Sequence, residues 1–276
     1  TDTSTNAVST VNLTGLYVGD HNAVQTVNTS VYVDDTVNLT ISDSELVGQS
    51  PATARRTTTG TGLNITDTPA AENATVTVTS STIKNFAQAG VDATASRNST
   101  KYDSDDVGPI VLSGTTIENN DGAGVVAAGN ITRSVTVNET STVTNNDIGV
   151  HANNENVTIN VLESTVSAQN GTNPGIRLDD AANDSSINGT AVVNNDIGLL
   201  VDAEFNGLDV TNNNFTNPTD IRNKGSTKLN ATLNYFGNSN VSVDDDAGTT
   251  TIYDPMLSQD KTSKYPTDVS DTTNFA

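Results

Sequence analysis

The chain of 276 residues has no cysteine, no tryptophan, one methionine and only 4% aromatic residues. Without cysteine it has neither disulfides nor a zinc site built on thiolates. Because only 33% of the residues are hydrophobic, a spherical domain of this length would have a thin core. A repeat array avoids this difficulty, since each repeat needs only a few inward Val, Ile, Leu and Ala side chains. The composition therefore favours a repeat architecture.

Basic residues are also scarce, with 12 Lys and Arg against 33 Asp and Glu and a formal net charge of -21. Such a surface repels nucleic acid and anionic lipid headgroups, which are bound through Lys and Arg. The charge is spread along the chain, which argues against a disordered acidic tail. Sparse Lys with abundant Asp, Thr and Asn resembles proteins of salt-loving archaea, where molar salt screens charge within roughly 3 Å. An acidic secreted protein from a less salty habitat is the other interpretation.

No apolar run is long enough to span a membrane. The sequence starts at Thr1, so we expect a signal peptide or lipid anchor to have been removed, and an anchor could follow Ala276 in a longer precursor. These features lead us to expect an extracellular or cell-surface protein of a high-salt environment, without a membrane span in this chain.

A five-residue offset between apolar residues recurs along the chain, usually in the pattern [ST]-x-[IVL]-x-N. The pairs are Ile41/Leu46, Val78/Ile83, Leu112/Ile117, Val161/Val166, Ile187/Val192 and Phe205/Val210, with Val137/Val143 one residue looser. Residues that return in register imply one supersecondary unit stacked on itself. The sequence therefore predicts a solenoid.

Strands that follow a glycine complete each repeat. Their inward positions are predicted at Val91/Ala93, Val125/Ala127, Val150/Ala152, Ile176/Leu178 and Leu199/Val201, and the residues between them, Asp92, Val126, His151, Arg177 and Leu200, should point outward. Asparagines mark the corners, because Asn tolerates a left-handed backbone. They lie at Asn85, Asn119–Asn120, Asn145–Asn146, Asn170, Asn194–Asn195 and Asn212–Asn214, and stacked they could form an amide ladder.

The tandem pattern resembles the right-handed parallel β-helix repeats of pectin-lyase-like proteins. Residues 230–257, with NATLNYFGNSN followed by TIYDPML, resemble the N-x-x-x-N-[YW]-[WF]-G … Y-x-P-x-L ending of NosD-like surface proteins of halophilic archaea. Phe236 stands where Trp is usual. The resemblance implies a fold but no particular activity, since this fold hosts lyases, hydrolases, adhesins, virion spikes and inert scaffolds.

We expect an all-β, single-domain right-handed parallel β-helix. Residues 1–38 would form an N-terminal cap with strands at Gly15–Val18 and Ser30–Val33. Residues 39–257 would form the rungs, with loop excursions at 48–62 and 96–108. Residues 258–276 would be a polar tail or linker.

If the chain is an enzyme, the resemblance implies carboxylates on one outer face, as in a polysaccharide lyase or a glycoside hydrolase. The rung alignment places one candidate patch on neighbouring strands: His151, Asn153, Arg177, Asp179, Asp180 and Asp202. The alternative is that outward positions of an acidic solenoid are Asp by composition alone and that His151 is a solvated side chain. The hydrolase signatures of the family are missing, so the sequence leaves catalysis open and gives no catalytic residue firmly.

Two acidic clusters, Asp103/Asp105/Asp106 and Asp244/Asp245/Asp246, could offer oxygen ligands to calcium, the one cofactor that the sequence suggests. Neither has the spacing of an EF-hand, and a solvated acidic loop is the alternative.

Triplets for N-glycosylation are frequent. They start at Asn12, Asn28, Asn38, Asn64, Asn73, Asn98, Asn130, Asn138, Asn156, Asn170, Asn183, Asn188, Asn214, Asn230 and Asn240. Chance alone would give about nine in a chain so rich in Asn, Ser and Thr. The excess favours a glycoprotein.

These observations favour a secreted, glycosylated structural or adhesive rod of a halophile, placed in a filament, a surface layer or a virion. Its partners would be other copies or surface proteins, because the ends of a solenoid must be capped or stacked. The alternative is a glycan-binding module or viral receptor-binding spike that uses the outer face or the two loops. An enzyme acting on polysaccharides is the third class.

Overall fold

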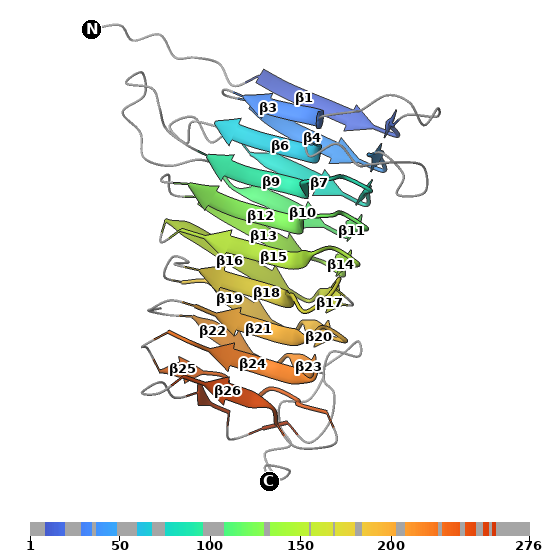
Figure 1. Cartoon of the computed structure of the whole chain (residues 1–276). Coiled ribbons are helices and arrows are strands. Elements are labelled where there is room, and N and C mark those ends of the chain that lie inside the picture. Colours follow the sequence, from blue (N-terminus) through green and yellow to red (C-terminus); the bar gives the residue numbers. More distant parts are fainter. Residues whose placement is uncertain are drawn as a thin grey trace, which may run out of the picture.

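The recurring five-residue offset becomes a corner between two short strands in the computed structural model of the chain (Figure 1). The structure describes residues 9–19, 29–34, 37–48, 60–67, 75–95, 108–129, 133–154, 156–167, 169–179, 184–202, 208–225, 228–237, 241–246, 251–253 and 256–257. These residues contain strands and turns and no helix. All paired strands run parallel, so the chain is an all-β parallel solenoid.

Each rung contributes one strand to each of three long sheets, which we name sheets A, B and C. Sheet A contains β1 (Ser9–Thr14), β4 (Val37–Ser42), β7 (Val76–Thr79), β10 (Ile110–Ser113), β13 (Arg133–Asn138), β16 (Val157–Leu162), β19 (Ser186–Asn188) and β22 (Asp209–Thr211). Sheet B contains β2 (Tyr17–Val18), β5 (Glu45–Val47), β8 (Thr82–Lys84), β11 (Thr116–Glu118), β14 (Thr142–Thr144), β17 (Thr165–Ser167), β20 (Ala191–Val193) and β23 (Asn214–Thr216).

Sheet C contains the glycine-led strands. In spatial order they are β3 (Thr29–Asp34), β6 (Thr61–Asp67), β9 (Ala89–Ala95), β12 (Ala123–Gly129), β15 (Ile148–Asn153), β18 (Pro174–Asp179), β21 (Ile197–Val201), β24 (Thr219–Asn223) and β26 (Val243–Asp245). A separate pair, β25 (Leu229–Asn230) and β27 (Thr251–Ile252), lies near the C-terminal end. The segment expected to cap the first rung supplies the end strand of all three sheets. β6 begins at Thr61, within the expected excursion 48–62, whereas residues 49–59 and 96–107 lie outside the described residues.

The interior is a narrow aliphatic column, as the sequence predicts. All ten inward positions predicted for sheet C are buried: Val91, Ala93, Val125, Ala127, Val150, Ala152, Ile176, Leu178, Leu199 and Val201. The offset pairs from Ile41/Leu46 to Ile187/Val192 are buried as well. One inward position is basic, because Arg133 is fully buried at the start of β13 and its Nη1 donates to the Ile65 carbonyl over 2.9 Å.

One offset pair has the wrong register. Val210 on β22 pairs with Ile187, so it takes the first position of its rung rather than the second. Its partner five residues on is Phe215 of β23, which is buried and in register with Val192. Phe205 lies outside the described residues.

Two columns of polar side chains, all buried except the half-buried Asn217, fill the corners. Between sheets A and B the column consists of Ser44, Ser81, Thr115, Ser141, Ser164, Thr190, Asn213 and Asn234. Between sheets B and C it consists of Asn120, Asn146, Gln169, Asn195 and Asn217. A side-chain oxygen on one rung commonly accepts the backbone N–H of the rung before it, as Asn146 Oδ1 does from Asn120 over 3.1 Å.

The amide ladder expected at the corners therefore exists, with two corrections. Gln169 occupies the position expected for Asn170, which is exposed, and Asn212–Asn214 belong to the other corner. In the Asn-Asn pairs the first residue takes the left-handed backbone, with φ of 57° at Asn119 and 55° at Asn145, and the second enters the ladder. Each asparagine of a pair thus has a separate task.

Glycines leave room for the ladder between sheets B and C. Gly149 lies on β15 in the NNDIG motif, and a Cβ built there would lie 2.3 Å from the Gly175 carbonyl and 3.1 Å from Nε2 of Gln169. A Cβ on Gly124 would lie 2.9 Å from Nδ2 of Asn146, and one on Gly175 would lie 2.8 Å from Nδ2 of Asn195. The glycine that precedes each apolar strand is therefore a packing requirement of the corner.

Residues of the expected ending close the C-terminal side. Phe236 stacks on Phe215 with ring centroids 5.7 Å apart, and Tyr253 meets Phe236 edge-on at 6.3 Å. Asn234 ends the corner column, and its carbonyl accepts the Leu257 N–H over 2.9 Å. The ending is thus a plug over the last rungs.

Candidate functional site

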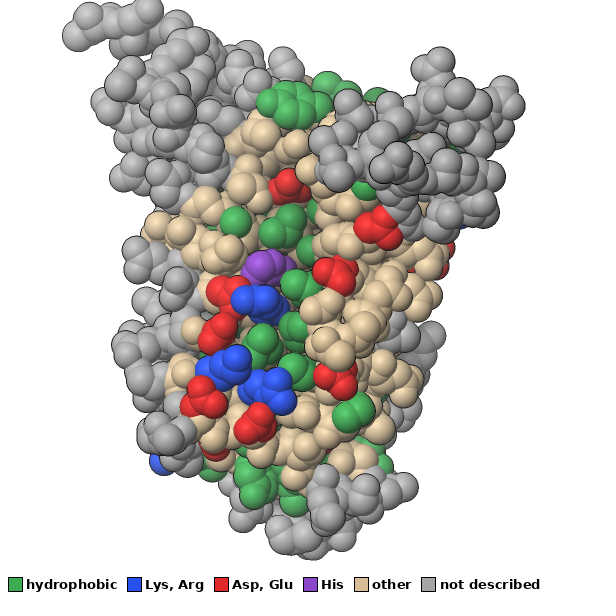
Figure 2. Space-filling view, in the orientation of Figure 1, with side chains coloured by type: hydrophobic (Ala, Val, Ile, Leu, Met, Phe, Trp, Pro, Cys, Tyr) green, Lys and Arg blue, Asp and Glu red, His purple; other side chains and the backbone are tan. Residues whose placement is uncertain are grey.

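The candidate patch lies on the outer face of sheet C, the face that Figure 2 shows. Side chains alternate along a strand, so Arg177 and Asp179 both point outward from β18. His151 on β15 is in register with Arg177, and Asn153 with Asp179. Asp202 follows β21, where its N–H donates to the Leu178 carbonyl over 2.9 Å. Three neighbouring strands therefore bring together His151, Asn153, Arg177, Asp179 and Asp202, five of the six predicted residues.

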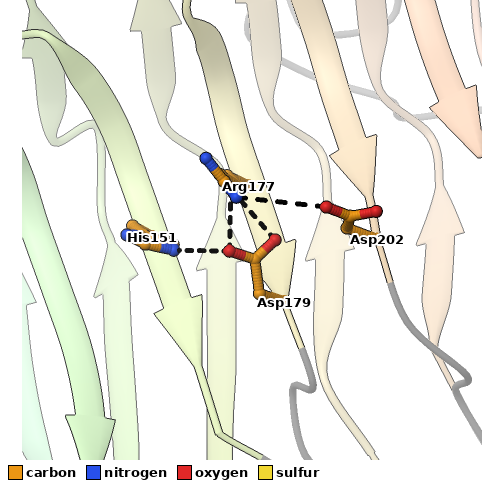
Figure 3. A network of polar contacts seen from close by, with 4 residues as sticks. All are labelled: His151, Arg177, Asp179 and Asp202. Atoms are coloured by element: carbon orange, nitrogen blue, oxygen red, sulfur yellow. Dashed lines mark hydrogen bonds and ion pairs between the residues drawn. The ribbon is translucent and has the colours of Figure 1, made fainter. Parts of the chain in front are cut away.

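Four of these side chains form one polar network (Figure 3). Asp179 Oδ2 lies 3.1 Å from His151 Nε2. Arg177 Nε donates to the same carboxylate at 2.9 Å from Oδ1, and it lies 2.8 Å from Oδ2. Arg177 Nη2 is 4.0 Å from Asp202 Oδ2. The His151 and Asp179 side chains are each 17% exposed, whereas those of Arg177 and Asp202 are 34% and 38% exposed.

The geometry favours binding over acid–base chemistry. A general acid or base must reach a substrate proton directly, but both oxygens of Asp179 are already held by its two partners. Arg177 joins Asp179 to Asp202, so the two carboxylates share one cation instead of facing a common substrate atom. The more exposed atoms belong to Arg177 and Asp202, which can donate to and accept from a neutral hydroxyl-bearing ligand. Asp180, the remaining candidate, lies outside the described residues.

The row of charges extends beyond the patch predicted from sequence. Arg222 on β24 donates through Nε to Asp244 Oδ2 on β26 over 2.6 Å. Leu200 separates this pair from the first network, since it is in register with both Arg177 and Arg222. Leu200 takes the outward position predicted for it, in register with the two arginines, but its side chain is buried, at 7% exposure. Extending the alternation of β21 by one rung, to the TDIRN strand, would have revealed Arg222.

The acidic cluster at Asp244, Asp245 and Asp246 does not converge on one point. Asp244 and Asp245 are neighbours on a strand and point to opposite sides, and Asp244 pairs with Arg222. Asp245 instead accepts from the N–H and hydroxyl of Thr251 at 2.8 and 2.7 Å. In the part of the chain that the structure describes, no group of three His, Cys, Asp or Glu residues could hold a metal ion. Asp103, Asp105 and Asp106 lie outside that part.

The glycosylation triplets and the ladder use different asparagines. None of the triplet asparagines within the described ranges is buried: Asn12, Asn38, Asn64, Asn138, Asn156, Asn170, Asn188, Asn214 and Asn230. The buried asparagines Asn120, Asn146, Asn195, Asn213, Asn223 and Asn234 all lie outside such triplets. Asn28, Asn73, Asn98, Asn130, Asn183 and Asn240 are not among the described residues.

Fold and site together define a parallel β-solenoid with a charged network on one outer face. Compared with family models, curated proteins and solved structures, the chain gives no match. Within the described residues, no helix is long and apolar enough to cross a membrane.

Proposed function

We propose that the chain is a secreted, N-glycosylated structural or adhesive rod of a salt-loving organism, displayed in a surface filament, a surface layer or a virion. The observation that carries the proposal is the division between the two sets of asparagines. Every buried asparagine of the described ranges lacks a glycosylation triplet, and every triplet asparagine there reaches the surface. A glycan on a ladder asparagine would destroy the corner, whereas a glycan on a triplet asparagine has room outside the strands.

The proposal includes kinship with the right-handed parallel β-helices of pectin-lyase-like and NosD-like surface proteins of halophilic archaea. Its support is the sequence ending at residues 230–257 together with the plug that Phe236 and Tyr253 form. The formal net charge of -21 supports a high-salt habitat, where such charge stays soluble and costs little stability. Its partners would be other copies or surface proteins.

Two measurements on native material kept at high salt test this function. Electron microscopy should show ordered filaments or arrays, and glycopeptide mass spectrometry should find glycans on triplet asparagines. Dispersed single particles with every triplet bare would contradict it.

A glycan-binding module is the second candidate, favoured by the network of His151, Arg177, Asp179 and Asp202 on an open face. Its planar donors and acceptors suit sugar hydroxyls. Asp179→Asn should abolish retention on a glycan array if the network binds sugar, whereas Asp92→Asn on the same outer face serves as the matched control. If glycan cleavage is found and survives Arg177→Ala and Asp179→Asn, this patch is not an active site.

A further inference from the structure

No described residue at an outward position of sheet A is charged over six consecutive strands, β1, β4, β7, β10, β13 and β16. The outward positions on these strands are Thr10, Asn12 and Thr14 on β1, Asn38, Thr40 and Ser42 on β4, Thr77 and Thr79 on β7, Val111 and the buried Ser113 on β10, Ser134, Thr136 and Asn138 on β13, and Thr158, Asn160 and Leu162 on β16. In a chain with 33 acidic and 12 basic residues, an uncharged patch of this size on the surface needs an explanation. We name these positions the neutral face.

The other two sheets carry charges at equivalent outward positions. Sheet C has the network described above together with the Arg222–Asp244 pair (Figure 2). Sheet B has Glu45 and Lys84, which form an ion pair at 2.6 Å, and Glu118 beside them. Strand propensity alone therefore does not account for the neutral face, because all three sheets obey the same alternation.

Acidic side chains lie along the edges of the neutral face, and Glu139 reaches onto it, because its Oε2 accepts a hydrogen bond from Ser113 Oγ. Asp43, Glu139 and Glu163 are exposed at the turns that lead from sheet A into sheet B. Asp184 and Asp209 are exposed at its C-terminal side. A charge-depleted centre with a charged rim is the usual anatomy of a protein–protein interface.

The neutral face is also regular. Its strand pairs from β1 to β16 keep their register without a bulge, in contrast to the shift between β3 and β6 in sheet C. Hydroxyl contacts cross between rungs, as from Thr14 to Ser42 over 3.0 Å. Two such sheets can pack face to face at about 10 Å.

From this arrangement we propose that the neutral face is the contact surface for a second copy of the chain, with sheet A packed on sheet A around a two-fold axis. The charge distribution favours a second copy of the chain as the partner and the neutral face as the contact. Two copies with a formal charge of -21 repel wherever their acidic surfaces meet, and the repulsion is least where the neutral faces meet. A two-fold contact needs only a self-complementary patch, which an uncharged array of hydroxyl, amide and methyl groups provides.

The size of the face fits a specific but modest contact. From strand spacing and rise, six strands present on the order of 500–600 Å² per copy, or about 1,100 Å² in total. This exceeds most crystal contacts and lies at the low end for specific complexes. The acidic rims of the two copies approach one another, so salt should strengthen the pairing.

The proposed function does not depend on this pairing, but glycans and pairing exclude each other at the triplet asparagines of the neutral face. Asn12, Asn38 and Asn138 lie within the neutral face and head glycosylation triplets. The triplets of Asn12 and Asn38 arise from outward Asn and Thr that alternate along β1 and β4, whereas the Asn138 triplet is completed by Thr140 in the turn after β13. Pairing requires Asn38 and Asn138 to be bare in native material, while triplets elsewhere, such as Asn170 and Asn214, remain free for glycans.

Sedimentation equilibrium of the unglycosylated recombinant chain tests the proposal. We expect a dimer in molar salt, with a dissociation constant at least tenfold higher near physiological ionic strength. Thr77→Glu and Thr136→Glu on sheet A should each weaken the dimer at least tenfold. Thr142→Glu and Thr165→Glu, which change outward threonines on sheet B, are the matched controls and should leave it intact. Circular dichroism and melting temperature confirm that each variant is folded.

The absence of cysteine permits a second test of orientation. Thr136→Cys should give a cross-linked dimer with a short bis-maleimide, and Thr165→Cys should not. A chain that stays monomeric at every attainable concentration in molar salt would overturn the proposal, as would equal sensitivity to the sheet A and sheet B variants. Glycans on Asn38 or Asn138 in native material would also overturn it, whereas the proposed function would then stand.

Discussion

At the scale of single residues, the fold depends on side chains that substitute for missing backbone partners at the corners. A buried N–H or C=O without a partner costs about 1–3 kcal/mol, and every corner turns several such groups inward. The Asn146 side chain joins its own rung to the preceding one, because its Oδ1 accepts from Asn120 and its Nδ2 donates to the carbonyls of Ile117 and Thr144. Polar residues are therefore as essential here as the aliphatic column.

We predict that Asn146→Ala lowers the free energy of unfolding by about 3 kcal/mol, because it leaves the Asn120 N–H and the Ile117 carbonyl buried without these partners. Urea unfolding followed by circular dichroism measures the loss. Asn145→Gly is the matched control, since Asn145 is exposed with a φ of 55° that glycine adopts freely, and it should change stability by less than about 0.5 kcal/mol. Equal losses in both variants would contradict the ladder.

Asp220 makes stability depend on pH in the opposite sense to a carboxylate whose pKa is lowered by an ion pair in the folded state. Burial raises the pKa of Asp220. Hydrogen bonds that its two oxygens accept from the backbone N–H groups of Asn217 and Ser242 offset part of this rise. A carboxyl whose pKa is raised in the folded state contributes to stability while it is protonated. This contribution is fully present below the unfolded-state pKa of about 4 and is lost as pH rises through the folded-state pKa. The stability of the original chain relative to Asp220→Asn should therefore fall as pH rises above about 4. Urea titrations of both proteins in molar salt would test this, and a constant difference would refute it.

At the scale of elements, the sequence predicts what repeats and misses what only the neighbouring rung decides. On five strands of sheet C the inward positions follow from alternation, and all ten that were predicted there are buried. Val210 has an apolar residue five positions away on each side, and only its pairing with Ile187 identifies Phe215 as its partner. Asn170 was predicted for the ladder position that Gln169 occupies, because the other ladder positions of that corner are asparagines. The longer side chain of Gln169 makes the same contacts as they do.

The candidate patch follows the same rule. The order of rungs placed His151, Arg177 and Asp179 together, because neighbouring strands of one sheet carry them in register. Arg222 and the burial of Leu200 were missed, since the glycine that marks other strands is replaced by Asp220 on β24. The separation of Asp244 from Asp245 follows from strand alternation, which an acidic run in a sequence does not reveal.

The glycine before each strand of sheet C gives a prediction at this scale. Gly149→Ala should lower the free energy of unfolding by about 1–3 kcal/mol, because the added Cβ would meet the Gly175 carbonyl at 2.3 Å and Val166 at 2.7 Å. Thermal and urea unfolding measure the change. Gly171→Asn, at an exposed corner with a φ of 70° and no atom near the added Cβ, should be close to neutral. A neutral Gly149→Ala would show that the corner has room for a side chain.

At the scale of the whole molecule, a solenoid behaves as a one-dimensional stack in which each rung contacts only its neighbours. The faces of the stack then become independent surfaces: sheet C carries the ion network, sheet A the neutral face, and the corners the structural polar groups. Such a molecule can change one face without disturbing another. Its ends are its weak points, because a terminal rung has a neighbour on one side only.

The aromatic plug at the C-terminal end tests this view. Phe236→Ala removes the ring that stacks on Phe215 and meets Tyr253, and we expect it to cost about 2–4 kcal/mol locally. Because rungs interact only with neighbours, hydrogen exchange should accelerate at least tenfold around β25 and β27 while β12 and β15 keep their protection. Phe86→Leu, a volume-reducing change after β8 in the third rung, is the matched control and should not affect the C-terminal strands. Uniform acceleration along the chain after Phe236→Ala would instead mean that the solenoid unfolds as one cooperative unit, with the plug holding all of it.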